Sequence, residues 1–371
     1  MNKKKLVIAC NHSFPHMGGA EKVIQQIAEY MDEKGWEVFI LGKSIKSALV
    51  HNFVKIQNCG STPSEFFHKL SVIKPDHLLV YSDYFVFWTH ILDRVESLDY
   101  KVTLIPVGMN AMLARPELLY KLRSNKDKIS VVTHSDNYQD YSTCKSLKIP
   151  VTVIPNGINL HELRKRDFSF KERYNIKTEK MLLCVSNFFP GKGQEYLLPM
   201  LNNFDSELKK DFTMVFICTT VNFAIANMLM GRTKAQLLNC SFNSKMLVDI
   251  PRWDVVQAFH EADIFLFPSQ KEVAPLVILE AMASKTPWVS LDVGSIPTLA
   301  GGTVITGAPC DREDNKMFNK RIREEFSQEI EKLLLDGDRR KCQADAGYKV
   351  IMNELNWDII GEKYYKFFEG E

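Results

Sequence analysis

Residues 262–293, "ADIFLFPSQKEVAPLVILEAMASKTPWVSLDV", contain an apolar run, a polar loop, an apolar helix-like stretch and a second apolar run. Two β-rich runs separated by a helical stretch are typical of a parallel sheet covered by helices. Proline loses no hydrogen bond at the first helical position, so we expect this helix to begin at Pro275 or Leu276. Glu272 then lies in the loop before the helix, and Glu280 lies in its second turn.

The same alternation of β-rich and helix-like segments extends through the whole chain. It begins with "KLVIAC" (5–10) and, after a polar passage, starts again with "MLLCVSN" (181–187). This pattern predicts an α/β fold with two Rossmann-like, doubly wound domains. We expect an N-terminal, acceptor-binding domain at 1–160, a C-terminal, nucleotide-sugar-binding domain at 161–350, and a C-terminal helix at 351–371 that packs on the first domain.

The composition excludes several classes of protein. Of the 371 residues, 45% are hydrophobic and 25% are charged, and no apolar run reaches the length of about 20 residues that a membrane span requires. The net charge of +2 gives no sign of a nucleic-acid-binding surface. The start of the chain lacks a signal-peptide apolar core, and the cysteines are scattered singly, so we expect a cytoplasmic protein with reduced thiols.

Candidate ligand-binding residues follow the predicted strands, where the ligands of open α/β sheets bind. "FFPGKG" (188–193) places Lys192 between two glycines at a strand-to-helix turn, where an ammonium group and backbone N–H groups can bind a phosphate. The carboxylates of Glu272 and Glu280 can each accept hydrogen bonds from two hydroxyls of a sugar. A nucleotide-sugar therefore suits these residues, although a solvated turn lysine, a surface glutamate and a helix-capping glutamate are the simpler alternative.

Six motifs occur together in one order: "GGAEK" (18–22), "VIPNGIN" (153–159), "PGKG" (190–193), "DIPRWDVVQAFHEADIFLFPS" (249–269), E-x7-E (272–280) and "DVGSIPTL" (292–299). This set resembles the retaining family 4 glycosyltransferases of GT-B fold, whose two Rossmann-like domains face each other across a cleft. The resemblance implies a hexosyl- or pentosyltransferase that uses a UDP- or GDP-linked sugar and retains the anomeric configuration. It implies a hydroxyl acceptor on a glycan or a lipid-linked surface polysaccharide, and no metal or other cofactor.

By this resemblance, Lys192 and Glu272 are the catalytic residues, on the diphosphate and on the transferred sugar, and Glu280 holds the ribose. The implied donor-binding positions are Gly18, Gly19, Asn187, Lys192, Arg252, Ala274, Leu276, Val277 and Glu280. The chain departs from the family twice: Asn187 replaces a usual arginine, and no histidine occurs in "TLIPVGMNAM" (103–112). His16 and His134 are the remaining candidates for acceptor contact, and a structural role for His134 is the alternative.

Other functions stay open at this point. The two departures leave room for a non-catalytic sugar-nucleotide-binding protein, and the lysine-rich composition would also suit a phage-type enzyme that glycosylates a DNA base. Only the latter would have a nucleic acid as its partner; a lipid-linked acceptor would instead bring the protein to the inner face of the membrane. We interpret "DGD" (336–338) as a helix-to-helix turn rather than a metal-binding D-x-D, so the sequence predicts no metal site.

Overall fold

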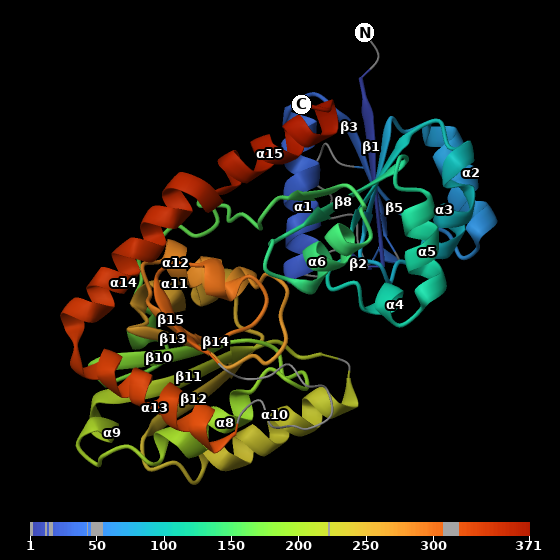
Figure 1. The fold of residues 1–371 in the computed structure, drawn as a ribbon. Coiled ribbons are helices and arrows are strands. Elements are labelled where there is room, and N and C mark those ends of the chain that lie inside the picture. Colours follow the sequence, from blue (N-terminus) through green and yellow to red (C-terminus); the bar gives the residue numbers. More distant parts are fainter. Residues whose placement is uncertain are drawn as a thin grey trace. The chain divides into compact units, whose positions relative to one another are not determined.

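The computed structural model describes residues 3–11, 13–14, 18–42, 44–45, 55–221, 223–306 and 319–371. The chain divides into two compact units (Figure 1). Unit 1 consists of Met1–Gly157 and Trp357–Glu371, and unit 2 consists of Ile158–Asn356. The domain boundaries expected from the sequence, 160/161 and 350/351, lie within a few residues of the two points at which the chain passes from one unit to the other.

Unit 1 contains a parallel sheet of seven strands in the order β5-β3-β1-β6-β7-β8-β9. The chain fills the sheet outward from β1 in both directions, so the strand order reverses between β1 and β6. Ile8 in β1 lies opposite Ile40 on one side and Leu79 on the other. The strands are β1 (Lys5–Cys10), β3 (Glu37–Gly42), β5 (Lys55–Asn58), β6 (His77–Tyr81), β7 (Lys101–Ile105), β8 (Ile129–Thr133) and β9 (Val151–Val153), with a separate short pair of β2 (Ser13–Phe14) and β4 (Ser44–Ile45).

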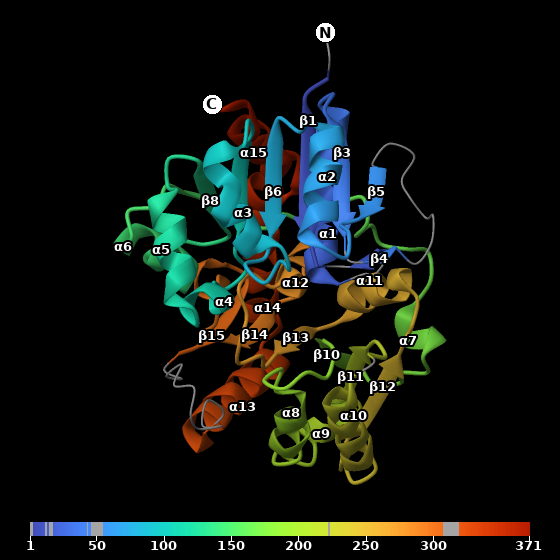
Figure 2. The same ribbon diagram turned by 90° about the vertical axis from the view of Figure 1, so that its right-hand side faces the viewer.

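Helices α2, α3 and α5 pack on one hydrophobic core of this sheet (Figure 2). Phe66, Trp88 and Leu122, one from each helix, are buried there against Val7 and Leu104 of the strands. The helices of unit 1 are α1 (Gly19–Glu33), α2 (Pro63–Ile73), α3 (Trp88–Arg94), η1 (Val95–Ser97), α4 (Asn110–Leu113), α5 (Pro116–Ser124), α6 (Gln139–Ser146) and α15 (Trp357–Glu369).

The C-terminal helix α15 belongs to unit 1 and lies beside α1 (Figure 1). Gly361 allows the close approach, because a Cβ atom there would lie 2.4 Å from the Tyr30 ring. Glu362 forms an ion pair of 2.9 Å with Lys34. The spacing of apolar residues in this segment predicts that Trp357, Ile360, Tyr364 and Phe367 lie on one apolar side. The structure buries the first three of these, but it buries Phe368 in place of Phe367.

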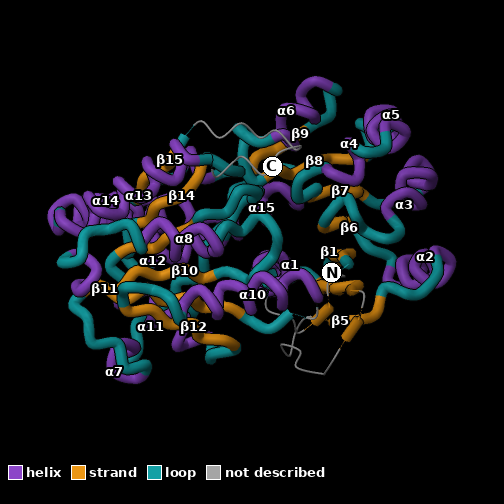
Figure 3. Tube along the Cα trace, turned by 90° about the horizontal axis from the view of Figure 1, so that it is seen from below, coloured by secondary structure: helices purple, strands orange, loops and turns teal. Residues whose placement is uncertain are grey.

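Unit 2 contains six parallel strands in the order β12-β11-β10-β13-β14-β15, with the reversal between β10 and β13. Helix α8 packs against α10 and α13, whereas α12 packs against α11 and α14, on the opposite face (Figures 1 and 3). The strands are β10 (Lys180–Val185), β11 (Phe212–Cys218), β12 (Asn243–Val248), β13 (Ile264–Phe267), β14 (Trp288–Leu291) and β15 (Gly302–Ile305). The helices are α7 (Phe170–Arg173), α8 (Gln194–Leu201), α9 (Leu208–Asp211), α10 (Ala224–Leu237), α11 (Arg252–Glu261), α12 (Leu276–Ala283), η2 (Ile296–Thr298), α13 (Lys320–Leu335), α14 (Gly337–Val350) and η3 (Ile351–Leu355).

The stretch at 262–293 forms β13, α12 and β14, as its pattern predicts. Leu266 of β13 lies opposite Val289 of β14 in a parallel ladder. Helix α12 begins at Leu276 with Pro275 as its N-cap residue, and it is almost completely buried, as its apolar residues on every side other than Glu280 predict. Among the helices of the described residues, none is both long and apolar enough to cross a membrane.

Candidate functional site

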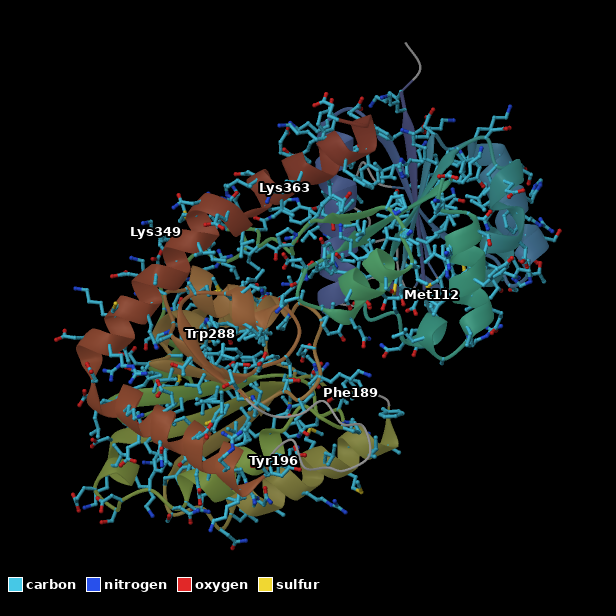
Figure 4. All side chains as sticks on the ribbon, in the orientation of Figure 1. Met112, Phe189, Tyr196, Trp288, Lys349 and Lys363 are labelled. Atoms are coloured by element: carbon cyan, nitrogen blue, oxygen red, sulfur yellow. The ribbon has the colours of Figure 1, made fainter. Side chains whose placement is uncertain are left out.

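The turn that carries Lys192 joins β10 to α8 and is locked to the loop after β13. Both glycines of this turn have left-handed backbone conformations, with φ values of 85° at Gly191 and 77° at Gly193. A Cβ atom on Gly193 would lie 2.2 Å from the carbonyl oxygen of Pro268, so only glycine permits this approach. The N–H group of Gln270 donates to the carbonyl oxygen of Gly191 at 2.7 Å. Figure 4 labels Phe189 and Tyr196, which flank the turn in the sequence.

The structure brings the two predicted catalytic residues into contact. The ammonium group of Lys192 lies 2.5 Å from Oε1 of Glu272, and the side chains are 26% and 13% exposed. The same carboxylate oxygen accepts a hydrogen bond of 2.7 Å from the fully buried Ser269 hydroxyl. Because β10 and β13 flank the strand-order reversal, this cluster lies where open α/β sheets bind ligands. Sequence analysis missed Ser269, although its position directly after a strand end is a usable signal.

Two donor-binding candidates form a second ion pair. The Arg252 guanidinium, at the start of α11, donates a hydrogen bond to Oε1 of the buried Glu280 carboxylate in α12. Burial acts to lower the pKa of Arg252, but the charge and hydrogen bond of Glu280 outweigh it and raise that pKa. Glu272 and Glu280 therefore each have a cationic partner of their own.

The first turn of α12 offers backbone donors next to Glu272. Leu276 and Val277 occupy the first two helical positions, where N–H groups have no partner within the helix, and Ala274 lies in the half-buried loop before them. Gly294 approaches this loop closely, since a Cβ atom on it would lie 2.4 Å from the carbonyl oxygen of Val273. A helix N-terminus held in this way favours an anionic ligand.

Asn187 follows β10 and is bound to the end of the adjacent strand. Its amide oxygen accepts hydrogen bonds from N and Oγ1 of Thr219 at 3.0 and 2.7 Å. The sequence gives no pairing information here, because the two residues are far apart along the chain. Thr219 is nevertheless the first residue after β11, a position where site residues are expected.

The candidates in unit 1 are placed less favourably for ligand contact. Gly18 is the N-cap residue of α1, the first helix after β1, and Gly19 is its first residue and is exposed. His16 lies outside the described residues. His134 is only 6% exposed, its Nδ1 lies 3.1 Å from the Ile154 carbonyl oxygen, and burial lowers its pKa. An acceptor could not reach this ring without displacing its neighbours, which argues for the structural alternative.

Two buried carboxylates hold the loop in which the family resemblance leads one to expect a histidine. Asp83 Oδ2 accepts hydrogen bonds from the N–H groups of Ala111 at 2.8 Å and Met112 at 3.1 Å. Asp140 Oδ2 accepts one from Gly108 at 2.8 Å. Burial is the main cause that raises the pKa of Asp140 to about 7, and the charge of Asp83 adds to it.

The "DGD" triplet is a helix-to-helix turn, as its sequence context predicts. Helix α13 ends at Leu335, and the Asp336 carboxylate caps α14 by accepting a hydrogen bond of 2.9 Å from the Arg339 N–H group. Within the part of the chain that the structure describes, no group of three or more His, Cys, Asp or Glu side chains could hold a metal ion.

Comparison with known proteins places this chain in a family. The family described as Glycosyl transferases group 1 matches residues 165–350, which is half of the chain. A GDP-mannose-dependent monoacylated alpha-(1-6)-phosphatidylinositol monomannoside mannosyltransferase of Corynebacterium glutamicum is 24% identical over 208 residues, covering 52% of this chain and 48% of that protein. An N-acetyl-alpha-D-glucosaminyl L-malate synthase of Bacillus anthracis is 24% identical over 330 residues, covering 80% of each. The matched region thus spans about half the length of the first relative.

Among solved structures, sucrose-phosphate synthase from Thermosynechococcus elongatus aligns with a TM-score of 0.80 at 15% identity, covering 99% of both chains. This likeness concerns the fold alone, and it confirms the predicted GT-B class of two Rossmann-like units. Residues 165–350 are a glycosyltransferase domain, and the chain belongs to the glycosyl transferases group 1 family.

Proposed function

We propose that the protein is a retaining glycosyltransferase that moves a sugar from a UDP- or GDP-linked donor to a hydroxyl acceptor. The observation that carries this proposal is the cluster of Lys192, Glu272 and Ser269 at the strand-order reversal of unit 2. The Lys192 ammonium group and a carboxylate held in place by a buried hydroxyl suit a ligand with a diphosphate beside a sugar. Family membership supports the reaction class, and the first turn of α12 adds donors for the same anion.

In the proposed reaction, the acceptor oxygen attacks the anomeric carbon on the face from which the diphosphate departs. The bond between the anomeric carbon and the phosphate oxygen breaks, and that oxygen receives the acceptor proton. Lys192 moves from Glu272 to the departing phosphate and stabilises its developing negative charge. Electrostatic stabilisation of this kind is usually the largest single contribution to catalysis. Ser269 keeps the Glu272 carboxylate in position when its cationic partner has moved. No step requires a metal ion.

The acceptor is proposed to be a glycan or a lipid-linked glycan, used by a cytoplasmic enzyme at the inner face of the membrane. The name of the Corynebacterium relative carries a phosphatidylinositol monomannoside, which is a lipid of this kind. The name of the Bacillus relative carries L-malate, a small acid that defines a second class to test.

The direct test is release of nucleoside diphosphate from UDP-glucose, UDP-N-acetylglucosamine and GDP-mannose. Each donor is incubated with the protein alone, with L-malate and with vesicles that contain phosphatidylinositol, in the presence and absence of EDTA. We expect one donor to be consumed at a rate that EDTA does not change and that Lys192→Ala lowers a hundredfold or more. Tight binding of a donor with no release under any condition would instead identify a non-catalytic binding protein.

A further inference from the structure

The hydrogen bonds between Thr219 and Asn187 fix the orientation of the Asn187 amide. A backbone N–H group can only donate, so the amide oxygen must be the atom that faces Thr219 N at 3.0 Å. The threonine hydroxyl then donates to the same oxygen at 2.7 Å. The amide nitrogen consequently points away from Thr219, and its two N–H groups have no hydrogen-bond partner among the described residues.

The backbone around this amide is also held. The N–H group of Ser186 donates to the carbonyl oxygen of Ile217 at 3.1 Å, which joins the ends of β10 and β11. The Gln194 side chain donates to the carbonyl oxygen of Asn187 at 3.0 Å. Asn187 is half-buried, so the amide is rigid yet reachable by a ligand, and it starts the same turn that carries Lys192.

The next pair along the strand ends uses the same two kinds of donor, but its acceptor is a carboxylate. N and Oγ1 of Thr220 donate to the Asp249 carboxylate at 2.7 and 2.5 Å. These hydrogen bonds lower the pKa of Asp249, which is therefore ionised at neutral pH and repels anions. Hydrogen-bond donors therefore lie beyond the end of β10, and a negative charge lies beyond the end of β12. This difference orients the phosphate end of an anionic ligand toward Asn187 and Lys192.

We propose that Thr219 is a positioning residue that locks the Asn187 amide so that its N–H groups donate to the diphosphate of the bound nucleotide. This inference rests on the proposed function, because it assumes that a nucleoside diphosphate binds here. Asn187 then provides a neutral, oriented donor beside the charged Lys192. The competing role for Asn187 is a brace between two strand ends that makes no ligand contact.

The two roles differ in what Asn187→Asp should do. A carboxylate would accept both Thr219 hydrogen bonds as well as the amide does, so a brace would survive this change and fail only in Asn187→Ala. A donor to the diphosphate would instead be replaced by a negatively charged acceptor facing an anion. The proposal therefore expects the aspartate variant to bind nucleotide more weakly than the alanine variant, and the brace expects the reverse order.

The experiment is calorimetric titration of the full chain with UDP and with GDP, and with uridine and guanosine as uncharged probes. We expect Asn187→Asp to weaken binding of the preferred diphosphate about a hundredfold and Asn187→Ala about tenfold, since hydrogen bonds to charged groups contribute about 1.5–3 kcal/mol. The matching nucleoside should bind both variants like the wild type. Thr219→Val, which removes the hydroxyl, should weaken diphosphate binding several-fold, and Thr219→Ser should restore it.

The chain offers a matched control for the added charge. Asn202 Oδ1 accepts hydrogen bonds from N and Oγ of Ser241 at 3.0 and 3.1 Å, the same arrangement next to the amino end of β12. Asn202→Asp should leave nucleotide binding unchanged, and thermal melting should show that every variant is folded.

Wild-type affinity in Asn187→Asp, or weaker binding in Asn187→Ala than in Asn187→Asp, would overturn the assignment and leave the proposed function standing. Failure of the wild type to bind either diphosphate would overturn both.

Discussion

Replacing Gly193 by alanine tests whether the contact between the Lys192 turn and the loop after β13 sets the geometry of the site. The new Cβ atom would lie 2.2 Å from the Pro268 carbonyl oxygen, whereas real Cβ contacts essentially never fall below 3.0 Å. The two loops must therefore separate by about 0.8 Å. Lys192 moves with one loop and Glu272 with the other, so the two groups no longer meet the substrate together.

A displacement of about 1 Å in an active site can lower the rate about a hundredfold, and we expect a loss of that order in Gly193→Ala. Gly191→Ala is the matched control. Gly191 has the same left-handed backbone, with φ of 85°, but nothing lies within 4 Å of the position of its Cβ. The control therefore carries only the backbone penalty, about 1–2 kcal/mol, which corresponds to a fall in melting temperature of roughly 2–8 °C for a domain of this size.

Both variants are compared by differential scanning calorimetry and by nucleoside diphosphate release at a temperature well below either transition. Gly191→Ala should keep most of its activity, and Gly193→Ala should melt lower than the control and lose activity while it is still folded. Equal activities in the two folded variants would show that the Gly193–Pro268 contact does not position the site, and the reasoning would be refuted.

Four further outcomes are expected. Lys192→Ala should lower turnover a hundredfold or more, because an electrostatic stabiliser of the leaving group is lost, and near-normal turnover would remove it from the site. Glu280→Gln should chiefly raise the donor KM and Glu272→Gln should chiefly lower kcat, as steady-state kinetics of both variants can decide. Asp336→Ala should keep its activity but lose about 0.5–2 kcal/mol of stability with the cap of α14, measured by chemical denaturation. The pKa of Asp140 is about 7 in the folded chain and near 4 in the unfolded one. The contribution of this residue to the free energy of unfolding is therefore full below about pH 4 and is lost as the pH rises through 7. Asp140→Asn should flatten the fall in the free energy of unfolding between these pH values.

Much of the fold could be predicted from sequence because its determinants are local. Short apolar β-rich runs that alternate with helix-like segments permit few arrangements other than parallel sheets covered by helices. The stretch at 262–293 shows this most clearly, since its pattern predicted β13, α12 and β14 and a helix start at Pro275 or Leu276, and the helix begins at Leu276. The rule that ligands bind beyond the carboxyl ends of strands also made Lys192 and Glu272 candidates for ligand binding, and the structure brings these two side chains into contact.

The partners of these side chains were decided only by the tertiary structure. Lys192 and Glu272 are 80 positions apart in the sequence, and Arg252 and Glu280 are 28 positions apart. Each pair meets because the strand order β12-β11-β10-β13 brings together the segments that follow these strands. Burial is equally non-local. The residues next to His134 in the sequence do not show whether its ring lies in a cleft or, as in the structure, in the interior. Pairing and burial depend on which strand ends are adjacent, and that adjacency is a property of the assembled sheet rather than of any single segment.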